Sequence, residues 1–597
     1  MWKINSFNYT RRPSFTVQVG KVKLGGDQAL RVQSMGNTDT NNTDASVEQA
    51  IRIIEAGAEL LRFTAQGLRE AENLKNIRQE LDKKGYSTPL VADIHFSPNA
   101  AEVAARNIEK VRVNPGNYVK SVKRLGDTSD YSDEEYQAEY ENIRERFLVL
   151  LAICKEHNTA LRIGVNHGSL SERMMNRYGD TPRGMVESCL EFLKICKEED
   201  FKNVVISMKT SNTVLMVQTV RLLVDRLEKE ELHFPLHLGV TEAGDGEDGR
   251  IKSAVGIGAL LVDGIGDTIR VSLSEDPEFE IPVARQLVEY TATRQNQTFI
   301  NAETSQFYSP FEYVKRETYA INNIGGENTP IVIATKKADY KTQPDYYLLS
   351  DKIVDNKGIE YSLTNIEELL SHKQKQNNLT FVKITLNNLT DEALNYLRTS
   401  SELVLLLHSD SDNHIGEQRA FFHKMLDAGC KTPVVICRNY QENSLEALQI
   451  KAACDMGVIF IDGFGDGILL ENEGQLTSEE INSIAFGILQ AARVRTTKTE
   501  YISCPSCGRT LFNLQTVIAR IKNRTSHLTG LKIGIMGCIV NGPGEMADAD
   551  YGYVGAGKGK VSLYKKKECI ERNIPENEAV DKLIELIKAN GDWHESC

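Results

Sequence analysis

The sequence predicts an α/β protein of three domains: an N-terminal TIM (β/α)8 barrel over residues 1–290, a second, partial TIM-like barrel over 291–492, and a smaller α+β domain over 493–597. Three observations lead to this prediction. The chain has 597 residues, well beyond the roughly 250–300 at which a single hydrophobic core stops growing. Short β-branched runs alternate with longer helix-periodic segments between residues 29 and 273. Part of this pattern then recurs later in the chain.

The first barrel is predicted from eight strand candidates with helical segments between them. The candidates are residues 30–35, 60–65, 89–95, 110–115, 160–167, 204–210, 235–244 and 267–273. Eight strand–helix units in about 250 residues fit a TIM barrel, in which active sites lie at the C-terminal ends of the strands. The segment "SVEQAIRIIEAG" predicts one of the helices, because Val47, Ile51 and Ile54 follow helical spacing and Gly57 is a stop signal.

The middle region is interpreted as a second barrel that has lost its binding residues. Residues 251–272 align without a gap to 450–471, an offset of 199, and nine of the 22 positions are identical. At this offset Lys209 corresponds to His408, Arg270 to Leu469 and Ser272 to Glu471. We therefore expect a spacer and docking surface with no chemistry of its own. Two unrelated βα units that share the same turns are the alternative.

Five basic residues lie in or at the ends of five predicted strands of the first barrel: Arg62, Arg112, Arg162, Lys209 and Arg270. Any single one is equally well explained by a neighbouring carboxylate. Five buried ion pairs would carry a large desolvation cost, so a shared anionic ligand is the better explanation for the set. Because guanidinium groups match phosphate oxygens, the pattern predicts a phosphorylated or diphosphorylated substrate.

Other polar residues also lie at predicted strand ends, namely Asp93, His95, Asn166 and Glu242. His95 and Glu242 are candidates for acid–base catalysis, and Asn166 is a candidate for orienting a hydroxyl group. Each of the four, taken alone, is also compatible with a hydrogen-bonded polar residue of the core.

Three cysteines near the C-terminus predict a metal site. "CPSCGRT" supplies Cys504 and Cys507 and runs into a helix-periodic segment, whereas "GCIVNGPGE" supplies Cys538, with Glu545 across a tight turn. A zinc ribbon would need a second close cysteine pair, and a thioredoxin-like pair would leave Cys538 unused. Three thiolates and one weaker oxygen ligand suit an iron–sulfur cluster with one exchangeable iron, so the spacing favours a cluster over zinc and Glu545 as the fourth ligand.

Composition and charge exclude several classes of protein. The net charge of −13 and the pI near 5.5 argue against broad binding to nucleic acid or anionic membranes. No apolar run reaches the ~18 residues of a membrane span, and the first residues contain no apolar signal core. Six other cysteines lie in apolar runs and are expected to be reduced core thiols, a cytosolic pattern: Cys154, Cys189, Cys196, Cys430, Cys437 and Cys454.

Several of these segments also carry a family resemblance. They are "VQSMGNTDT", "VADIHF", "VRVNPGN", "RIGVNHGSL", "LHLGVTEAG", "GIGDTIRVSL", "CPSCGRT" and "GCIVNGPGE". The chain resembles the 4-hydroxy-3-methylbut-2-enyl diphosphate synthase family, the iron–sulfur enzymes of the methylerythritol phosphate route to isoprenoids. The resemblance covers the first 275 and last 100 residues, and the inserted middle is similar to the three-domain version of that family.

The resemblance implies a reductive ring opening of 2-C-methyl-D-erythritol 2,4-cyclodiphosphate that consumes two electrons and releases water. It implies one 4Fe-4S cluster, held in a C-terminal domain like those of sulfite and nitrite reductases. The implied cluster ligands are Cys504, Cys507, Cys538 and Glu545; the implied substrate-binding residues are Arg62, Arg112, Arg162, Asn166, Lys209 and Ser272; the implied acid–base residue is Glu242. Arg270 and His95 lie in matching segments, and we expect them to take part in binding and catalysis respectively.

The expected partners are the cyclic diphosphate and a flavodoxin or ferredoxin as electron donor, with no nucleic acid or membrane. We expect an active site within one chain, in a monomer or weak dimer, and a bacterial cytoplasmic location rather than a plastid one. The functional alternative is a zinc-stabilised scaffold with a silent barrel. A radical S-adenosylmethionine enzyme is disfavoured because its three cysteines would form one compact run near the first strand.

Overall fold

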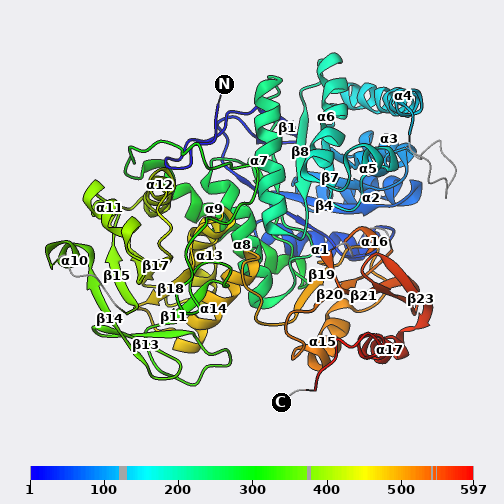
Figure 1. Ribbon diagram of the computed structural model, residues 1–597. Coiled ribbons are helices and arrows are strands. Elements are labelled where there is room, and N and C mark those ends of the chain that lie inside the picture. Colours follow the sequence, from blue (N-terminus) through cyan, green and yellow to red (C-terminus); the bar gives the residue numbers. More distant parts are fainter. Residues whose placement is uncertain (1, 120–130, 373–377, 540–541, 546–547, 596–597) are drawn as a thin grey trace.

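The computed structural model describes residues 2–119, 131–372, 378–539, 542–545 and 548–595, with the side chains of His372, Pro543 and Glu545 left out. Figure 1 shows two barrels side by side and a smaller C-terminal domain beneath the first barrel. The two barrels and the mixed C-terminal sheet confirm the predicted fold class. Among the described residues, no helix combines the length and apolar character needed to cross a bilayer.

The first barrel contains all eight predicted strands. In chain order they are β3 (Arg31–Met35), β4 (Leu60–Ala65), β5 (Leu90–Ile94), β6 (Lys110–Val113), β7 (Ala160–Asn166), β8 (Val204–Lys209), β9 (His237–Leu238) and β10 (Thr268–Ile269). They follow the order β8-β7-β6-β5-β4-β3-β10-β9, and a parallel bridge between Ile206 and Leu236 closes the ring. Strands β9 and β10 are shorter than predicted. The β9 ladder stops where the Lys209 amino group lies against Gly239.

Helices surround this barrel and a hairpin covers its floor. The helices are α1 (Thr43–Glu55), α2 (Leu68–Lys83), α3 (Pro98–Ala105), α4 (Asp133–His157), α5 (Glu172–Tyr178), α6 (Pro182–Glu198), α7 (Thr213–Lys229), α8 (Gly246–Val262) and α9 (Glu280–Ala292). The predicted helix at 46–57 is confirmed as α1, and Gly57 follows it with a φ of 107°. The hairpin of β1 (Val17–Val19) and β2 (Val22–Leu24) packs on the buried N-terminal halves of the strands. The open end of the barrel is therefore the C-terminal one.

The middle region is a closed barrel of eight strands rather than the partial barrel predicted. The strands are β11 (Ile331–Ala334), β12 (Tyr346–Leu349), β13 (Lys352–Asp355), β14 (Glu360–Asn365), β15 (Thr380–Ile384), β16 (Leu403–Leu407), β17 (Val434–Tyr440) and β18 (Gly467–Asn472). Its departure from a TIM barrel lies in an antiparallel stretch, because short turns join β12, β13 and β14 directly. Its helices are α10 (Ile366–His372), α11 (Asp391–Thr399), α12 (His414–Asp427), α13 (Leu445–Ile461) and α14 (Ser478–Ala491).

The two barrels meet at a pair of equivalent helices. Helix α8 begins at residue 246 and α13 at 445, an offset of 199, and both have 17 residues. A Cβ atom at Gly258 would lie 2.8 Å from the Cys454 sulfur, and one at Gly457 would lie 2.7 Å from the equivalent Val255. The helices therefore approach closely through two glycines related by the internal repeat, which supports the duplication inferred from sequence.

A symmetric charge network is buried beside these helices. Arg221 contacts Asp263 and Asp462 at 2.8 Å each, and Arg419 contacts the same two carboxylates at 2.8 Å each. All four side chains are at most 2% exposed. Because each arginine bridges an aspartate of each barrel, the network fixes the orientation of one barrel on the other.

The C-terminal domain is a five-stranded mixed sheet with helices on one face. Its elements are β19 (Glu500–Ser503), α15 (Leu514–Thr525), β20 (Lys532–Met536), α16 (Gly542–Glu545), β21 (Tyr551–Gly557), β22 (Lys560–Lys565), β23 (Glu568–Pro575) and α17 (Glu576–Ala589). Helices α15 and α17 pack on one apolar face of the sheet. Helix α15 begins at Leu514, ten residues after Cys504, so both CPSC cysteines lie in a loop and not at the helix terminus.

Candidate functional site

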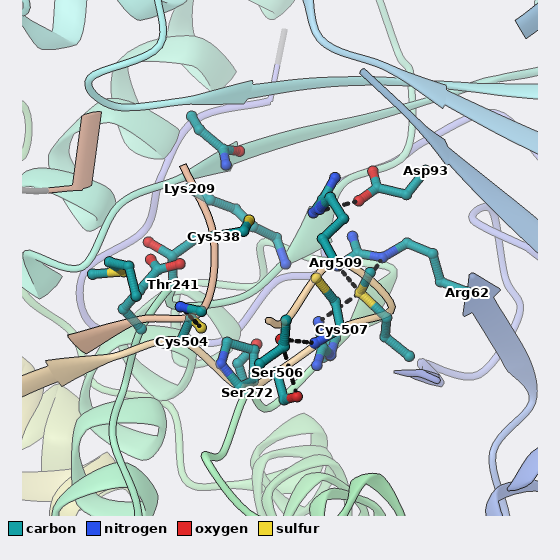
Figure 2. Close-up of a pocket in the computed structure, with 18 of the residues that line it drawn as sticks. Arg62, Asp93, Lys209, Thr241, Ser272, Cys504, Ser506, Cys507, Arg509 and Cys538 are labelled. Atoms are coloured by element: carbon teal, nitrogen blue, oxygen red, sulfur yellow. Dashed lines mark hydrogen bonds and ion pairs between the residues drawn. The ribbon is translucent and has the colours of Figure 1, made fainter. Parts of the chain in front are cut away.

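A cavity lies between the C-terminal end of the first barrel and the C-terminal domain. Its barrel wall contains Met35, Arg62, Asp93, Arg112, Arg162, Asn166, Lys209, Thr241, Glu242, Arg270 and Ser272. Its other wall contains Cys504, Pro505, Ser506, Cys507, Arg509, Thr510, Met536, Gly537, Cys538 and Gly542. Figure 2 shows Lys209 and Arg62 on the same cavity as the three cysteines. Twelve residues named in the sequence analysis thus line one cavity.

Three of the predicted cations face this cavity without an ion-pair partner among the described residues. They are Arg62, Arg162 and Lys209, from β4, β7 and β8, and each is at most 8% exposed. The Nε and Nη1 atoms of Arg162 have no hydrogen-bond partner among the residues that the structure describes. Burial lowers the pKa of Arg62 to about 10, and burial followed by the charge of Arg162 lowers the pKa of Lys209. A polyanion would supply the missing counter-charge for all three.

The other two predicted cations are paired with carboxylates. Arg112 Nη1 donates to Asp93 Oδ1 at 3.0 Å, and Arg270 makes two bonds of 2.9 and 3.1 Å to Glu280. Arg112 also donates to the Gly164 carbonyl at 2.9 Å. Pairing with a neighbouring carboxylate therefore accounts for the burial of Arg112 and Arg270, although both also line the cavity.

Glu242 lies at the cavity in a strained backbone conformation. Its φ is +47°, in the left-handed region that non-glycine residues rarely adopt, and its side chain is buried. Phe96, next to His95, and Ser506, between two of the cysteines, also have positive φ values. A strained backbone conformation costs free energy and persists only where surrounding contacts enforce it, which is common at functional sites.

The C-terminal domain is held over the barrel by contacts next to the cysteines. Ser274 Oγ lies 2.7 Å from Ser503 Oγ and donates to the Cys504 carbonyl at 3.0 Å. A Cβ atom on Gly168 would lie 2.3 Å from the Gly544 carbonyl oxygen, so α16 rests directly on the loop after β7. The close approach allows only glycine at this position. Both walls of the cavity are therefore positioned within one chain.

Comparison with known proteins agrees with this arrangement. The GcpE TIM-barrel domain family matches residues 14–285, and the GcpE protein C-terminal domain family matches residues 500–589. A protein of Parabacteroides distasonis named 4-hydroxy-3-methylbut-2-en-1-yl diphosphate synthase (flavodoxin) is 56% identical, with 98% of this chain and 99% of that protein covered. The chain belongs to this synthase family. Proteins of the same name from Porphyromonas gingivalis and Leptospira interrogans are 52% and 41% identical, each over 99% of this chain and at least 98% of their own length.

Arg509 is a residue of the synthase site that the sequence reasoning missed. It is 7% exposed, lines the cavity and lies 3.8 Å from Asp93. Burial alone would lower the pKa of Arg509, but the charges of Cys507, Asp93 and Cys538 outweigh burial and raise it. Its position within "CPSCGRT", two residues after Cys507, was the available signal.

His95 does not line the cavity of this synthase. Its Nε2 atom lies 3.2 Å from Asp93 Oδ2, and its ring is 3% exposed. Burial, followed by the charge of Arg509, lowers the pKa of His95 to about 3. A neutral imidazole behind Asp93 fits a residue that orients the carboxylate better than one that transfers protons to substrate.

The three cysteines fit the sulfur-rich site of an iron–sulfur synthase. All three line the cavity, and the Gly537 N–H donates to Cys504 Sγ at 3.3 Å. Burial raises the pKa of the Cys504 thiol to about 12, so its thiolate form would require nearby positive charge, such as a bound metal would supply. The backbone of Glu545 ends α16, but its side chain lies outside the described part of the structure.

Proposed function

We propose that this chain is a 4-hydroxy-3-methylbut-2-enyl diphosphate synthase that opens the ring of 2-C-methyl-D-erythritol 2,4-cyclodiphosphate by two-electron reduction. One observation carries the proposal: three buried cations, none of which has a carboxylate partner in the described part of the chain, face three cysteines across a single cavity. An anionic substrate held by the cations would contact the cysteine wall, so binding and reduction take place in one space. Family membership supports the identity of the substrate.

The barrel wall binds and orients the diphosphate. Arg62, Arg162 and Lys209 make charge-assisted hydrogen bonds to its oxygens, with Arg112 and Arg270 contributing beside their own carboxylates. Asn166 and Ser272 line the same wall and are suited to fixing phosphate and hydroxyl oxygens. The domain above excludes water and so strengthens every electrostatic contact in the cavity.

The cysteine wall would hold the reducing group. We assign Cys504, Cys507 and Cys538 as ligands of one 4Fe-4S cluster, with Glu545 as the fourth, oxygen ligand. When bound, such a cluster supplies single electrons and one iron with a replaceable ligand. Arg509, between this wall and Asp93, provides positive charge beside the anionic thiolates.

Glu242 transfers the proton that the substrate hydroxyl group requires in order to leave as water. Its carboxyl group lines the cavity and its backbone has a φ of +47°, which supports a role for this residue in proton transfer. Asp93 and His95 act as positioning residues, because His95 contacts Asp93 and Asp93 in turn contacts Arg112.

The electron donor, the cellular location and the oligomeric state are assigned as follows. We propose a flavodoxin as electron donor and a bacterial cytoplasmic location, following the names and organisms of the relatives. The second barrel acts as a spacer that holds the C-terminal domain over the first barrel. The site then needs no partner subunit, which fits a monomer or weak dimer.

Anaerobic purification tests this function directly. We expect a brown protein with absorption near 400 nm that converts the cyclodiphosphate to the open-chain allylic diphosphate when dithionite supplies electrons. A colourless protein that binds stoichiometric zinc and converts nothing would instead support the scaffold alternative.

A further inference from the structure

Met35, the last residue of β3, places a neutral sulfur atom next to two cations of the cavity wall. Its side chain is 2% exposed and lines the cavity. Arg62 donates to Met35 Sδ through Nε at 3.0 Å and through Nη2 at 2.7 Å, and Figure 2 draws the hydrogen bonds of Arg62 as dashed lines. Arg270 Nη1 donates to the same sulfur at 3.4 Å. One thioether therefore accepts hydrogen bonds from two guanidinium groups.

The pairing of β3 with β4 fixes this contact. Met35 and Arg62 are direct partners in the parallel register, so their side chains leave the sheet on the same face. The Gly36 N–H donates to the Arg62 carbonyl at 2.9 Å, and a Cβ atom on Gly36 would lie 2.6 Å from the Phe63 ring. The backbone thus holds the sulfur beside the guanidinium of Arg62, whether or not a ligand is present.

The acceptor for Arg62 differs in charge from the acceptors of the paired arginines. Arg112 donates to Asp93, and Arg270 makes two further bonds to Glu280. These carboxylates cancel part of the positive charge of their partners. A thioether is a weak and neutral acceptor, so it orients the guanidinium of Arg62 and leaves its positive charge available.

We infer that Met35 is a positioning residue that aims Arg62 and Arg270 at the diphosphate without neutralising them. The guanidinium group is a rigid planar fork, so holding the Nε–Nη2 edge of Arg62 on sulfur leaves its Nη1 atom for a phosphate oxygen. This inference rests on the proposed function, because the diphosphate is the ligand of the same cavity.

Three substitutions of Met35 separate the orientation of the arginines from their charge. Met35→Leu keeps a similar volume and removes the acceptor. Met35→Gln offers a neutral oxygen acceptor on a side chain of similar length, and Met35→Glu offers a charged one. The matched control is Met174→Leu, because Met174 of α5 is 0% exposed, accepts the Tyr136 hydroxyl on its sulfur at 3.5 Å and lies outside the cavity lining.

The readouts are the dissociation constants of the cyclodiphosphate and of inorganic pyrophosphate, measured by calorimetry, and the melting temperature. We expect Met35→Leu to raise both dissociation constants about fivefold, as the loss of one ordinary hydrogen bond does, and Met35→Gln to stay within about twofold of the wild type. Met35→Glu should raise both constants at least about tenfold, because its carboxylate competes with the diphosphate for Arg62.

The melting temperature distinguishes this role from a structural one. Met35→Glu should melt at or above the wild-type temperature, because it pairs Arg62 with a carboxylate, even though it binds the diphosphate worst. The control should bind both ligands like the wild type, and the iron–sulfur spectrum should stay unchanged in every variant.

Two results would overturn the role of Met35. Wild-type affinity in Met35→Leu would show that the sulfur only fills space, and wild-type affinity in Met35→Glu would show that the acceptor need not be neutral. If Met35→Glu does not fold, the difference between the leucine and glutamine variants decides the question. A wild-type protein that does not convert the cyclodiphosphate would contradict the proposed function instead, and the pyrophosphate constants would still rank the Met35 variants.

Discussion

Lys209 and Arg270 are both buried cations, but they differ in whether a carboxylate lies within ion-pair distance. Lys209 is 5% exposed and no described carboxylate lies within ion-pair distance, whereas Arg270 is 2% exposed and makes two bonds to Glu280. An unpaired buried charge costs stability and persists where binding requires it. A buried cation that is paired with a carboxylate, such as Arg270, contributes mainly to the stability of the fold.

Replacing Lys209 with methionine should therefore separate binding from stability. We expect Lys209→Met to weaken binding of the cyclodiphosphate by about 1.5–3 kcal/mol, the range for a hydrogen bond to a charged group. The melting temperature should stay equal or rise, because an unpaired buried cation is removed. Calorimetric titration and thermal unfolding measure the two effects, with the iron–sulfur spectrum as a check that the cysteine wall is intact.

Arg270→Met is the contrasting variant. It leaves Glu280 buried without its partner, so we expect a loss of stability of about 3–5 kcal/mol. A second change, Glu280→Leu, should recover part of that loss. If Lys209→Met destabilises the protein as strongly as Arg270→Met, Lys209 has a structural role and its proposed part in diphosphate binding is wrong.

Glu545 allows a test that needs no knowledge of its side-chain position. We expect Glu545→Gln to retain the 4Fe-4S spectrum, because three cysteines remain, but to lose most of its turnover, because an amide oxygen is a poorer ligand than a carboxylate. Electron paramagnetic resonance and steady-state rates measure the two properties. Wild-type turnover in this variant would remove Glu545 from the assignment.

At the scale of elements, the strands and closure of the first barrel were predictable, whereas closure of the second barrel was not. Apolar runs of β-branched residues identified all eight strands of the first barrel, because such runs are specific to buried parallel strands. The antiparallel β12–β13–β14 stretch escaped prediction, since its pairing depends on the short turns that join three short strands. Likewise the cations and cysteines were found by residue type, but Arg509 and the role of His95 depend on contacts between residues over 400 positions apart.

The α8–α13 contact gives a prediction at this scale. Gly258→Val would press into Cys454, so we expect a loss of about 1–3 kcal/mol from overpacking. In a Cys454→Ala background the same change should cost clearly less, since the methyl groups gain space. Denaturant unfolding of the four proteins gives the coupling energy, and strict additivity would show that the two helices do not meet at these residues.

At the scale of the whole molecule, the spacer role that we propose for the second barrel would allow one chain to complete its own site. It packs on the first barrel through α8, α13 and the four-residue charge network, and α14 then leads into β19 and the cysteine loop. Lys252 of α8 meets Glu500 of β19 at 2.9 Å, which ties the C-terminal domain to the first barrel of the same chain. In a two-domain relative without such an insert, a partner subunit would have to provide that support.

Mixing two inactive variants tests this single-chain site most directly. Glu242→Ala disables the barrel wall and Cys504→Ser disables the cysteine wall, while each chain keeps the other wall intact. Turnover is measured for each variant alone, for the mixture after co-expression, and for wild type diluted into either variant. A site formed within one chain predicts that the mixture is as inactive as its components, whereas substantial recovery of turnover would show that the two walls come from different chains.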